Sequence, residues 1–413
     1  MRAKPIVLTS ILLLCHLRLT STARADDWPQ FRGPTGQGLS SDKNLPTTWS
    51  IKTGQNILWK SPLPKSDNPY SSPIVCRGKL ITTITTNANR EHHVLCFDAL
   101  TGKPLWDTII PPGPWLLTDL RGGYSAPTPA CDGQRIFAFF GSCVLVALDM
   151  DGQPLWRYEF KDTAFDVAIG TSPILYKDLL IICADQNQKK SRLIAFDRAG
   201  GAVKYEIPRP NVAFAHSTPI LATLNDKPEL LIAASNALQG VDPDTGKIIW
   251  WCKADGDSAS PVFDSKTNLA YIDSGRGSPG IAVDITGSGD VTKTHLKWRT
   301  EKPIPESLSS AVISGGHLYR IQTPGILRCI DLATGRDLYT QRLEGASPWS
   351  SPIATADGLI YLASSKTTFV VKAGPTFELV ATNSLDDPNH ASAAISDGRI
   401  YLKGQKFVYC ISK

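Results

Sequence analysis

The sequence predicts an all-β protein, an eight-bladed β-propeller built from four-stranded antiparallel blades. A short phrase of small residues, Pro and an aliphatic residue recurs eight times along the chain. Short β-rich runs separated by turns follow each copy, and the 413 residues include 30 Pro and 32 Gly but only 2 Met. Many turn formers favour strands over helices, and a fixed period indicates a repeat architecture.

The recurring phrase marks the start of each repeat. Its copies lie at residues 71–74, 125–128, 171–174, 217–220, 259–262, 309–312, 350–353 and 392–395. From Pro73 to Ala394 the seven intervals cover 321 residues, a period of about 46 that suits one four-stranded blade. After each copy, a Gly- or Asp-centred turn leads into a run of Ile, Leu, Val, Phe or Tyr, which is a hairpin signal.

A second phrase ends the third strand of the repeat. Its clearest copies run from Cys96 to Trp106 and from Gly240 to Trp250, with looser copies at 149–156, 197–205 and 331–339. Asp and Thr side chains stabilise a tight turn, Gly allows a positive φ, and the aromatic residue packs against the next blade. The residues expected to dock between blades are Trp59, Trp106, Trp156, Tyr205, Trp250, Trp298 and Tyr339.

The two ends of the repeat region complement each other. Residues 409–413 form a third strand with no aromatic strand after it, whereas residues 56–63, which include Trp59, form an aromatic strand with no strands before it. The N-terminal strand should therefore join the C-terminal blade and close the ring. The predicted organisation is a signal peptide at 1–25, an N-terminal extension at 26–55 and the propeller at 56–413.

The first 25 residues have the pattern of a secretory signal peptide. Arg2 and Lys4 precede an apolar run at 6–14, and Ala23-Arg24-Ala25 predicts cleavage after Ala25. The apolar run is too short to span a bilayer. Leu14 stands before Cys15 where a lipid-attachment motif has a small residue, so lipidation is not favoured. We expect an exported chain with no membrane span, in the periplasm or outside the cell.

The charge of the exported chain excludes two classes of partner. The full sequence has 43 basic and 38 acidic residues, and losing the four basic residues of the signal peptide leaves 39 against 38. A net charge this close to zero argues against binding to nucleic acid or to an anionic membrane surface.

Eight cysteines follow the signal peptide: Cys76, Cys96, Cys131, Cys143, Cys183, Cys252, Cys329 and Cys410. They include no Cys-x-x-Cys motif and no adjacent pair, so no zinc, redox or c-type haem site is predicted. Several recur at equivalent repeat positions, which favours small buried core residues. An even number in an exported chain leaves disulfides open.

The two phrases and the aligned Trp residues resemble the repeats of the pyrroloquinoline quinone (PQQ)-like propeller superfamily. The stretches 27–38, 45–50, 287–293 and 372–374 resemble the exported BamB-like proteins of planctomycetes. The resemblance covers residues 27 to 413 and implies an eight-bladed ring. It implies no single function, because the superfamily holds both quinoprotein alcohol dehydrogenases and the non-enzymatic BamB propeller.

In the dehydrogenase branch, the resemblance implies a vicinal Cys-Cys ring, a calcium ion and a catalytic Asp around the quinone. This sequence has no adjacent cysteines, and Asp119, Asp166 and Asp257 lack calcium-loop spacing. We therefore expect no cofactor and no metal. No Gly-x-Ser-x-Gly or His-Glu-x-x-His motif occurs, and His92-His93 is expected in an exposed loop.

One repeat position offers a candidate binding site. Three residues before the Pro of the opening phrase, the eight repeats carry Tyr70, Tyr124, Gly170, His216, Ser258, Leu308, Trp349 and Ala391. Packing and loop anchoring would explain these aromatic residues. Alternatively, Tyr70, Tyr124, His216 and Trp349, with nearby Arg121 and Arg276, rim a funnel mouth where a peptide, glycan or small ligand docks.

The sequence favours a non-enzymatic exported propeller that binds envelope proteins or extracellular polymers, and we expect a monomer. The first alternative is a quinoprotein oxidoreductase that depends on PQQ and calcium. The second is a carbohydrate-active propeller enzyme, which would need two inward carboxylates at a suitable separation.

Overall fold

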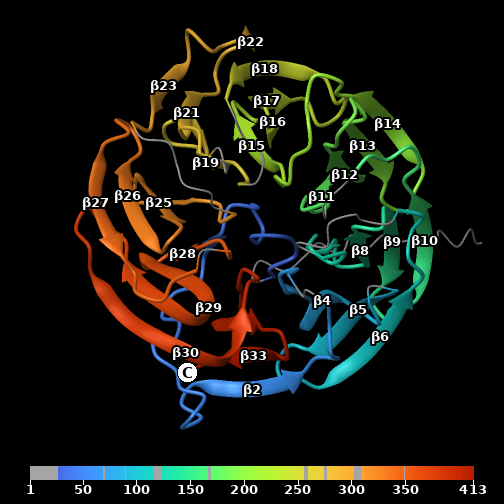
Figure 1. Cartoon of the computed structure of the whole chain (residues 1–413), viewed down its shortest axis with the longest axis vertical. Coiled ribbons are helices and arrows are strands. Elements are labelled where there is room, and N and C mark those ends of the chain that lie inside the picture. The colour runs from blue at the N-terminus through green and yellow to red at the C-terminus, as the bar shows by residue number, and fades with distance from the viewer. Residues whose placement is uncertain are drawn as a thin grey trace, which may run out of the picture.

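The computed structural model describes residues 27–67, 70–88, 90–115, 123–165, 169–254, 259–273, 277–301, 308–347 and 349–413. Strands from these ranges form eight sheets arranged in a ring around a central axis (Figure 1). The predicted all-β, eight-bladed propeller is confirmed. Within the same ranges, no helix is long and apolar enough to cross a membrane.

Seven blades run in chain order from their innermost strand to their outermost strand, and the eighth takes its outermost strand from the N-terminal part of the chain. Blade 1 contains β3 (Ile74–Cys76), β4 (Lys79–Thr86), β5 (Glu91–Asp98) and β6 (Pro104–Ile110). Blade 2 contains β7 (Ala130–Cys131), β8 (Arg135–Phe140), β9 (Val144–Asp149) and β10 (Pro154–Glu159). Blade 3 contains β11 (Ile174–Tyr176), β12 (Leu179–Ala184), β13 (Arg192–Asp197) and β14 (Val203–Pro208). Blade 4 contains β15 (Ile220–Leu224), β16 (Lys227–Ala233), β17 (Ala237–Val241) and β18 (Ile248–Lys253).

The second half of the ring follows the same plan. Blade 5 contains β19 (Val262–Asp264), β20 (Leu269–Ile272), β21 (Ile281–Asp284) and β23 (Leu296–Arg299). Blade 6 contains β24 (Val312–Ser314), β25 (His317–Gln322), β26 (Ile326–Asp331) and β27 (Asp337–Arg342). Blade 7 contains β28 (Ile353–Thr355), β29 (Leu359–Lys372) and β30 (Leu379–Asn389). Blade 8 contains β31 (Ala394–Ser396), β32 (Arg399–Lys403), β33 (Phe407–Ile411) and β2 (Ile57–Pro62).

Burial along a blade explains the two kinds of strand in the sequence. The middle strands β4 and β5 are buried at their six central positions, so they consist of almost unbroken apolar or small polar residues. The outer strand β6 alternates between exposed and half-buried positions, because only one of its faces packs on the ring. The outer strands of blades 2 and 3 have the same alternation.

Two blades carry additions to the basic plan. In blade 7, β29 runs for 14 residues where other blades have two strands, and Ser365 in its middle has a φ of 51°. In blade 5, the insert that follows β21 contributes β22 (Gly289–Asp290), which pairs in parallel with β18 at the edge of blade 4. A further short strand, β1 (Leu39–Ser40), pairs in parallel with β28 on the inner side of blade 7.

The N-terminal strand closes the ring as predicted. In blade 8, β2 pairs antiparallel with β33, and Trp59 lies opposite Cys410. Figure 1 shows β2 in blue along the outside of the red C-terminal strands. The blade therefore joins the two ends of the propeller through backbone hydrogen bonds.

A circle of hydrogen bonds, here called the hydroxyl belt, joins the innermost chain segments of all eight blades. In each blade a Ser or Thr just before the innermost strand accepts the backbone N–H of the equivalent residue in the preceding blade, at distances from 2.9 to 3.1 Å. The members in order are Ser72, Thr128, Ser172, Thr218, Ser260, Ser310, Ser351 and Ser392. Ser392 then donates its N–H to Ser72 Oγ, so the circle is complete.

Residues 27–38, here called the axial segment, lie inside the ring. Trp28 exchanges two backbone hydrogen bonds with Val75 of blade 1, and Pro29 O accepts the N–H of Cys131 in blade 2. Gln37 Oε1 accepts the N–H of Phe263 in blade 5 at 2.6 Å. Gly38 O accepts the N–H of Ala354 in blade 7. Figure 1 shows this dark blue segment at the centre of the ring.

The contacts at the two ends of the axial segment show which face of the ring it covers. Its first residue, Asp27, accepts the N–H of Arg77, which lies in the turn after the innermost strand of blade 1. The chain leaves the axis beside the matching turn of blade 7, where Asn44 N–H donates to Asp357 at 2.8 Å. We call this side the turn face, and we call the side where the innermost strands begin the start face. Trp28 and Arg32 are each only 2% exposed, so the segment is part of the core.

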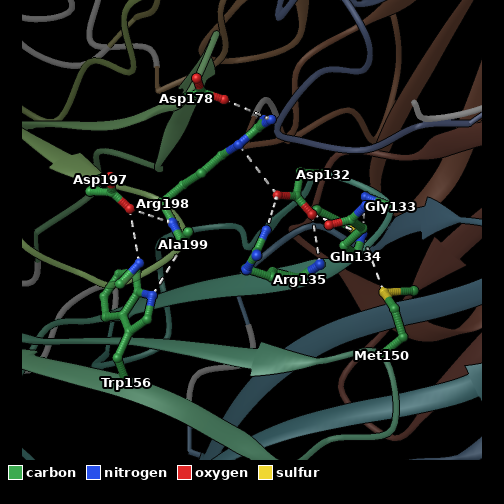
Figure 2. A network of polar contacts seen from close by, with 12 residues as sticks. Asp132, Gly133, Gln134, Arg135, Met150, Trp156, Asp178, Asp197, Arg198 and Ala199 are labelled. Carbon is green, nitrogen blue, oxygen red and sulfur yellow. Dashed lines mark hydrogen bonds and ion pairs between the residues drawn. The ribbon is translucent and has the colours of Figure 1, made fainter. Parts of the chain in front are cut away.

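Five of the seven predicted docking residues reach the next blade. The indole or phenol groups donate to backbone carbonyls there, in the pairs Trp59–Ala99, Trp106–Met150, Trp156–Arg198, Tyr205–Pro243 and Trp298–Leu332. The rings also cover the turn glycines, since a Cβ atom on Gly102 would lie 2.5 Å from the Trp59 ring. Figure 2 shows Trp156 at the Asp197–Ala199 turn of blade 3, beside the ion pair of Arg198 with Asp132.

The other two predicted docking residues have different contacts. Trp250 is fully buried, and its Nε1 donates to Glu229 within blade 4 at 2.8 Å rather than to a carbonyl of blade 5. The Tyr339 ring packs edge-on against Phe377 of blade 7, at 5.6 Å between centroids. The neighbouring Tyr319 contacts the blade 7 turn at Gly374.

The hydroxyl belt should contribute measurably to stability. Ser351→Ala removes the acceptor for the buried N–H of Ser310, so we expect the free energy of unfolding in urea to fall by about 1–3 kcal/mol. Ser351→Thr is the matched control, because Thr128 and Thr218 serve in the same position. A Ser351→Ala protein as stable as the wild type would show that the belt does not hold the blades.

Candidate binding site at the start face

The hydroxyl belt sets the register of the repeats and corrects the sequence alignment in two of them. In repeat 2 the belt residue is Thr128, so Pro129 rather than Pro127 is the opening Pro. In repeat 8 the belt residue is Ser392, so Ala393 rather than Ala394 takes this place. The position two residues before the belt therefore holds Ala126 instead of Tyr124, and His390 instead of Ala391.

In this register, three rings lie together where the propeller closes, on blade 8 and on its two neighbours. Tyr70, Trp349 and His390 stand two residues before the belt in blades 1, 7 and 8, which are neighbours in the ring. Tyr70 stacks on Trp349 with 6.0 Å between ring centroids and an interplanar angle of 19°. His390 packs edge-on against both, at 5.5 Å from each. We call this group the aromatic triad.

The triad is partly exposed to solvent, and the chain next to it is buried. Trp349 is 43% exposed, whereas Ser350 and Ser351, which follow it, are buried. Burial raises the pKa of Tyr70 and lowers the pKa of His390. Both shifts favour the neutral side chains at pH 7, so the triad presents an uncharged aromatic surface.

A lysine that the sequence analysis did not single out lies beneath Tyr70. Lys403 of β32 is 1% exposed, and its Nζ lies within hydrogen-bond distance of Ser71 O, Ser71 Oγ and Thr83 O, at 2.8–3.0 Å. These contacts join blade 8 to blade 1 directly under the triad. Burial lowers the pKa of Lys403 well below its ordinary value of 10.5.

His216 occupies the triad position in blade 4, away from the triad. Its ring packs edge-on against Phe214 at 4.5 Å. It also leans over blade 3, where a Cβ atom on Gly170 would lie 2.8 Å from His216 Cβ. The small residue at this position of blade 3 leaves room for the imidazole of blade 4.

The structure places four of the six predicted rim residues, in three environments. Tyr70 and Trp349 lie together, and His216 lies across the ring from them. Tyr124 is 5% exposed and packs near His92 at 5.8 Å, so it is a core residue and not a rim residue. Arg121 and Arg276 lie outside the described residues, as do Asp119, Asp166 and Asp257.

The prediction that His92 and His93 lie in an exposed loop is wrong. Both belong to β5 and are buried. His92 stacks on Phe140 at 4.7 Å and contacts Ser142 Oγ through Nε2, and burial lowers its pKa to about 4. His93 Nδ1 contacts Asp107, and this hydrogen bond raises the pKa of His93. The pair was misplaced because imidazole rings can replace apolar side chains in a strand when each finds a polar partner.

The described residues do not fit a calcium–quinone site. Across the ranges that the structure covers, no group of three or more His, Cys, Asp or Glu side chains could hold a metal ion. The sequence contains no adjacent cysteines to form the ring that the resemblance implies above a quinone. Among the described residues, the donor set is thus unlike the one expected for that cofactor.

A second hollow lies off the axis, between blades 3 and 4. It has a volume of about 450 Å³ and is lined by Pro208, Pro210, Val212, Ile248 and Trp251 among others. Arg209 at its base forms a buried two-point ion pair with Asp185, at 2.8 and 3.1 Å. Because this pairing satisfies the guanidinium within the protein, the hollow offers mainly apolar contacts.

Comparison with known proteins defines the family. The family model described as outer membrane protein assembly factor BamB matches residues 90–341. The chain belongs to this family. No curated protein is detectably similar in sequence.

Solved structures of the BamB-like and quinoprotein kinds share the fold. BamB from Moraxella catarrhalis superposes with a TM-score of 0.62 and 13% identity, covering 86% of this chain and 97% of that one. A europium-containing methanol dehydrogenase gives a TM-score of 0.70 and 12% identity, covering 92% and 89%. The computationally designed Ika8 protein gives 0.56 and 12%, covering 86% and 99%. At these identities the similarity shows the fold alone.

The buried Lys403 predicts a pH dependence of stability. Between its lowered pKa and 10.5 the unfolded chain binds a proton that the folded chain lacks, so the free energy of unfolding should rise with pH. Lys403→Met removes this contribution, and the slope between pH 7 and 10 should decrease by up to about 1.4 kcal/mol per pH unit.

Urea unfolding at several pH values measures both slopes. The exposed Lys406 of the same blade supplies the control, since Lys406→Met should have the same slope as the wild type. An unchanged slope in Lys403→Met would mean that Lys403 keeps its proton in the folded protein.

Proposed function

We propose that this BamB-like propeller is a non-enzymatic binding platform of the cell envelope, and that its partner docks on the aromatic triad of the start face. The observation that carries the proposal is the triad itself. Three rings from blades 1, 7 and 8 are in mutual contact, and the largest of them is 43% exposed. An exposed Trp on a rigid base is the kind of residue that dominates the energy of an interface.

The properties of the triad suggest what it would bind. An uncharged aromatic surface offers stacking and apolar contact rather than attraction for ions, so it suits an apolar side chain of a protein or the apolar face of a sugar ring. These are features of an envelope protein or an extracellular polymer. The near balance of 39 basic and 38 acidic residues after removal of the predicted signal peptide agrees with such a neutral partner.

The position of the triad also favours binding. The axial segment lies towards the turn face of the ring, so a ligand on the axis would approach from the start face. The hydroxyl belt holds the backbone next to each of the three rings, so binding should cost little conformational entropy there. Export through the predicted signal peptide, with cleavage after Ala25, and a monomeric state are part of the same proposal.

An oxidoreductase is the second candidate. The methanol dehydrogenase supports it, since that structure superposes over 92% of this chain with a TM-score of 0.70. Against it stand the lack of adjacent cysteines and the lack of a metal-ligand cluster in the described ranges. We therefore place the binding platform first.

Removing the exposed ring tests the proposal. Envelope components retained by the exported protein would be identified by mass spectrometry, and the dissociation constant of the main purified partner would then be measured. Trp349→Ala should weaken binding by about 30-fold or more, as expected for loss of a central aromatic contact. Its melting temperature should fall by less than about 2 °C, because the side chain is exposed.

Trp251→Ala is the matched control. Trp251 is also a partly exposed Trp, 37% exposed, but it lies in the hollow between blades 3 and 4. The Trp251→Ala protein should bind the partner with the dissociation constant of the wild type. Unchanged binding in Trp349→Ala, or a loss of binding that occurs only with a large loss of stability, would contradict the proposal.

A further inference from the structure

Two cysteines meet at the seam between the first two blades. Cys76 ends β3 and Cys131 ends β7, which are the innermost strands of blades 1 and 2. Each stands two residues before a turn glycine, but Cys76 lies four residues after the belt residue Ser72 and Cys131 lies three residues after Thr128. Their sulfur atoms are 2.6 Å apart. No other two cysteine sulfurs among the described residues are in such contact.

This separation is too short for two independent thiols. Non-bonded carbon atoms keep about 3.5 Å or more between them and sulfur is larger than carbon, whereas a disulfide bond is about 2.05 Å long. Both cysteines are buried, at 0% and 1% exposed, and they share one apolar cluster with Ile74 and Ile136. The two inner strands therefore already hold the sulfurs where a covalent bond needs them.

We infer that Cys76 and Cys131 form a disulfide bond that joins blades 1 and 2 when the chain is exported. The bond forms by exchange with an oxidised dithiol donor of the envelope. The thiolate of one cysteine attacks the disulfide of the donor and displaces one donor sulfur. The thiolate of the other cysteine then displaces the second donor sulfur, so the chain loses two protons and two electrons and the donor gains them. The inference rests on the proposed export, because such donors act outside the cytosol.

The structure also indicates when this exchange must happen. Contact with Cys131, together with burial, raises the pKa of the Cys76 thiol in the folded protein. A thiol that holds its proton is a poor nucleophile, and the buried sulfurs are closed to a donor protein. The bond therefore forms while blades 1 and 2 assemble, before the inner strands are covered.

The bond would lie directly beside the axial segment. Trp28 pairs with Val75, next to Cys76, and Pro29 O accepts the N–H of Cys131 itself. A covalent link between the two strands fixes the spacing of both attachment points. It also encloses the second, third and fourth strands of blade 1 in one loop, which restricts the unfolded chain.

A soft metal ion is the competing explanation for this group of sulfurs. Met150 Sδ lies 3.7 Å from Cys131 Sγ, so two thiolates and a thioether are close together. However, two sulfurs bound to one metal at about 2.3 Å each stand roughly 3.7 Å apart in tetrahedral geometry. The observed 2.6 Å between Cys76 and Cys131 favours the direct bond.

Peptide mapping of the exported protein tests the inference. The protein is denatured with N-ethylmaleimide present and without reductant, then digested and analysed by mass spectrometry. We expect one linked peptide joining Cys76 to Cys131, lighter by two hydrogen atoms than the two thiol peptides together, and alkylation of the other six cysteines that follow the signal peptide. Alkylation of both residues, or a copper(I) or silver(I) ion that binds to both sulfurs, would overturn it.

Refolding separates the inference from the question of export. Protein denatured, reduced and refolded in a glutathione redox buffer should form the same single link. If only the refolded protein contains it, the chain is not exported to an oxidising compartment and the proposed location fails, while the pairing stands. If neither sample contains the link, the pairing is wrong.

Variants measure what the bond contributes. Cys76→Ala, Cys131→Ala and the double variant should lower the melting temperature by a similar amount, about 3–6 °C, because each removes the same bond. Reducing the wild-type protein in its unfolded state should lower its melting temperature by a similar amount. The same treatment should leave the melting temperatures of these variants unchanged. Cys183→Ala, a buried cysteine in β12 of blade 3, corrects for loss of a core sulfur and should keep the sensitivity to reductant. Additive effects of the two single variants would contradict a shared bond.

Discussion

The closed circle of eight hydroxyl–backbone hydrogen bonds is the constraint on which the rest of this propeller depends. Each blade supplies one backbone N–H and one Ser or Thr oxygen, and the last bond returns from Ser392 to Ser72. The interior of a ring has no neighbouring strand to satisfy these N–H groups, and a buried unpaired N–H is costly. The belt pairs these N–H groups, and it also holds all eight chain segments at the same level along the ring axis. The candidate site follows, because residues at one repeat position in adjacent blades then lie side by side.

Two further features build on this ring. The docking residues join the outer strand of one blade to a turn of the next, as Trp59, Trp106 and Trp156 do. The axial segment joins blades that are far apart around the ring, since Trp28 contacts blade 1 and Gly38 contacts blade 7. The inner belt therefore restrains every blade, and the docking residues and the axial segment add restraints at other radii in the blades that they contact.

The repeat phrases were enough to predict the blades, their number and the closing strand, because each carries a physical requirement that every blade must meet. They did not fix the register everywhere. Repeat 2 has two prolines, Pro127 and Pro129, around Thr128, and repeat 8 has alanines in place of the Pro, so only the hydrogen bonds of the belt distinguish the alternatives. This is why Tyr124 was predicted at the rim and His390 was not.

Other features of the site come from contacts that no local pattern encodes. Lys403 resembles an ordinary strand-end lysine, and its burial results from the meeting of blades 8 and 1. The axial segment contains Gly, Pro and Gln typical of a loop, and its buried position depends on partners more than 200 residues away, such as Phe263. Cys76 and Cys131 lie at different distances from the belt residues of their repeats, and their contact depends on how blades 1 and 2 pack against each other.

A ring that serves as a binding platform and not as a quinone enzyme should not bind pyrroloquinoline quinone. The most direct test is to titrate purified residues 26–413 with pyrroloquinoline quinone and calcium while following absorbance and melting temperature. We expect no saturable change in the absorbance or in the melting temperature. Binding of quinone to the native state alone, at 100 times its dissociation constant, would add about 2.7 kcal/mol of stability. A matching rise in melting temperature, together with dye-linked oxidation of an alcohol, would rule out a purely non-enzymatic platform and make the protein an oxidoreductase.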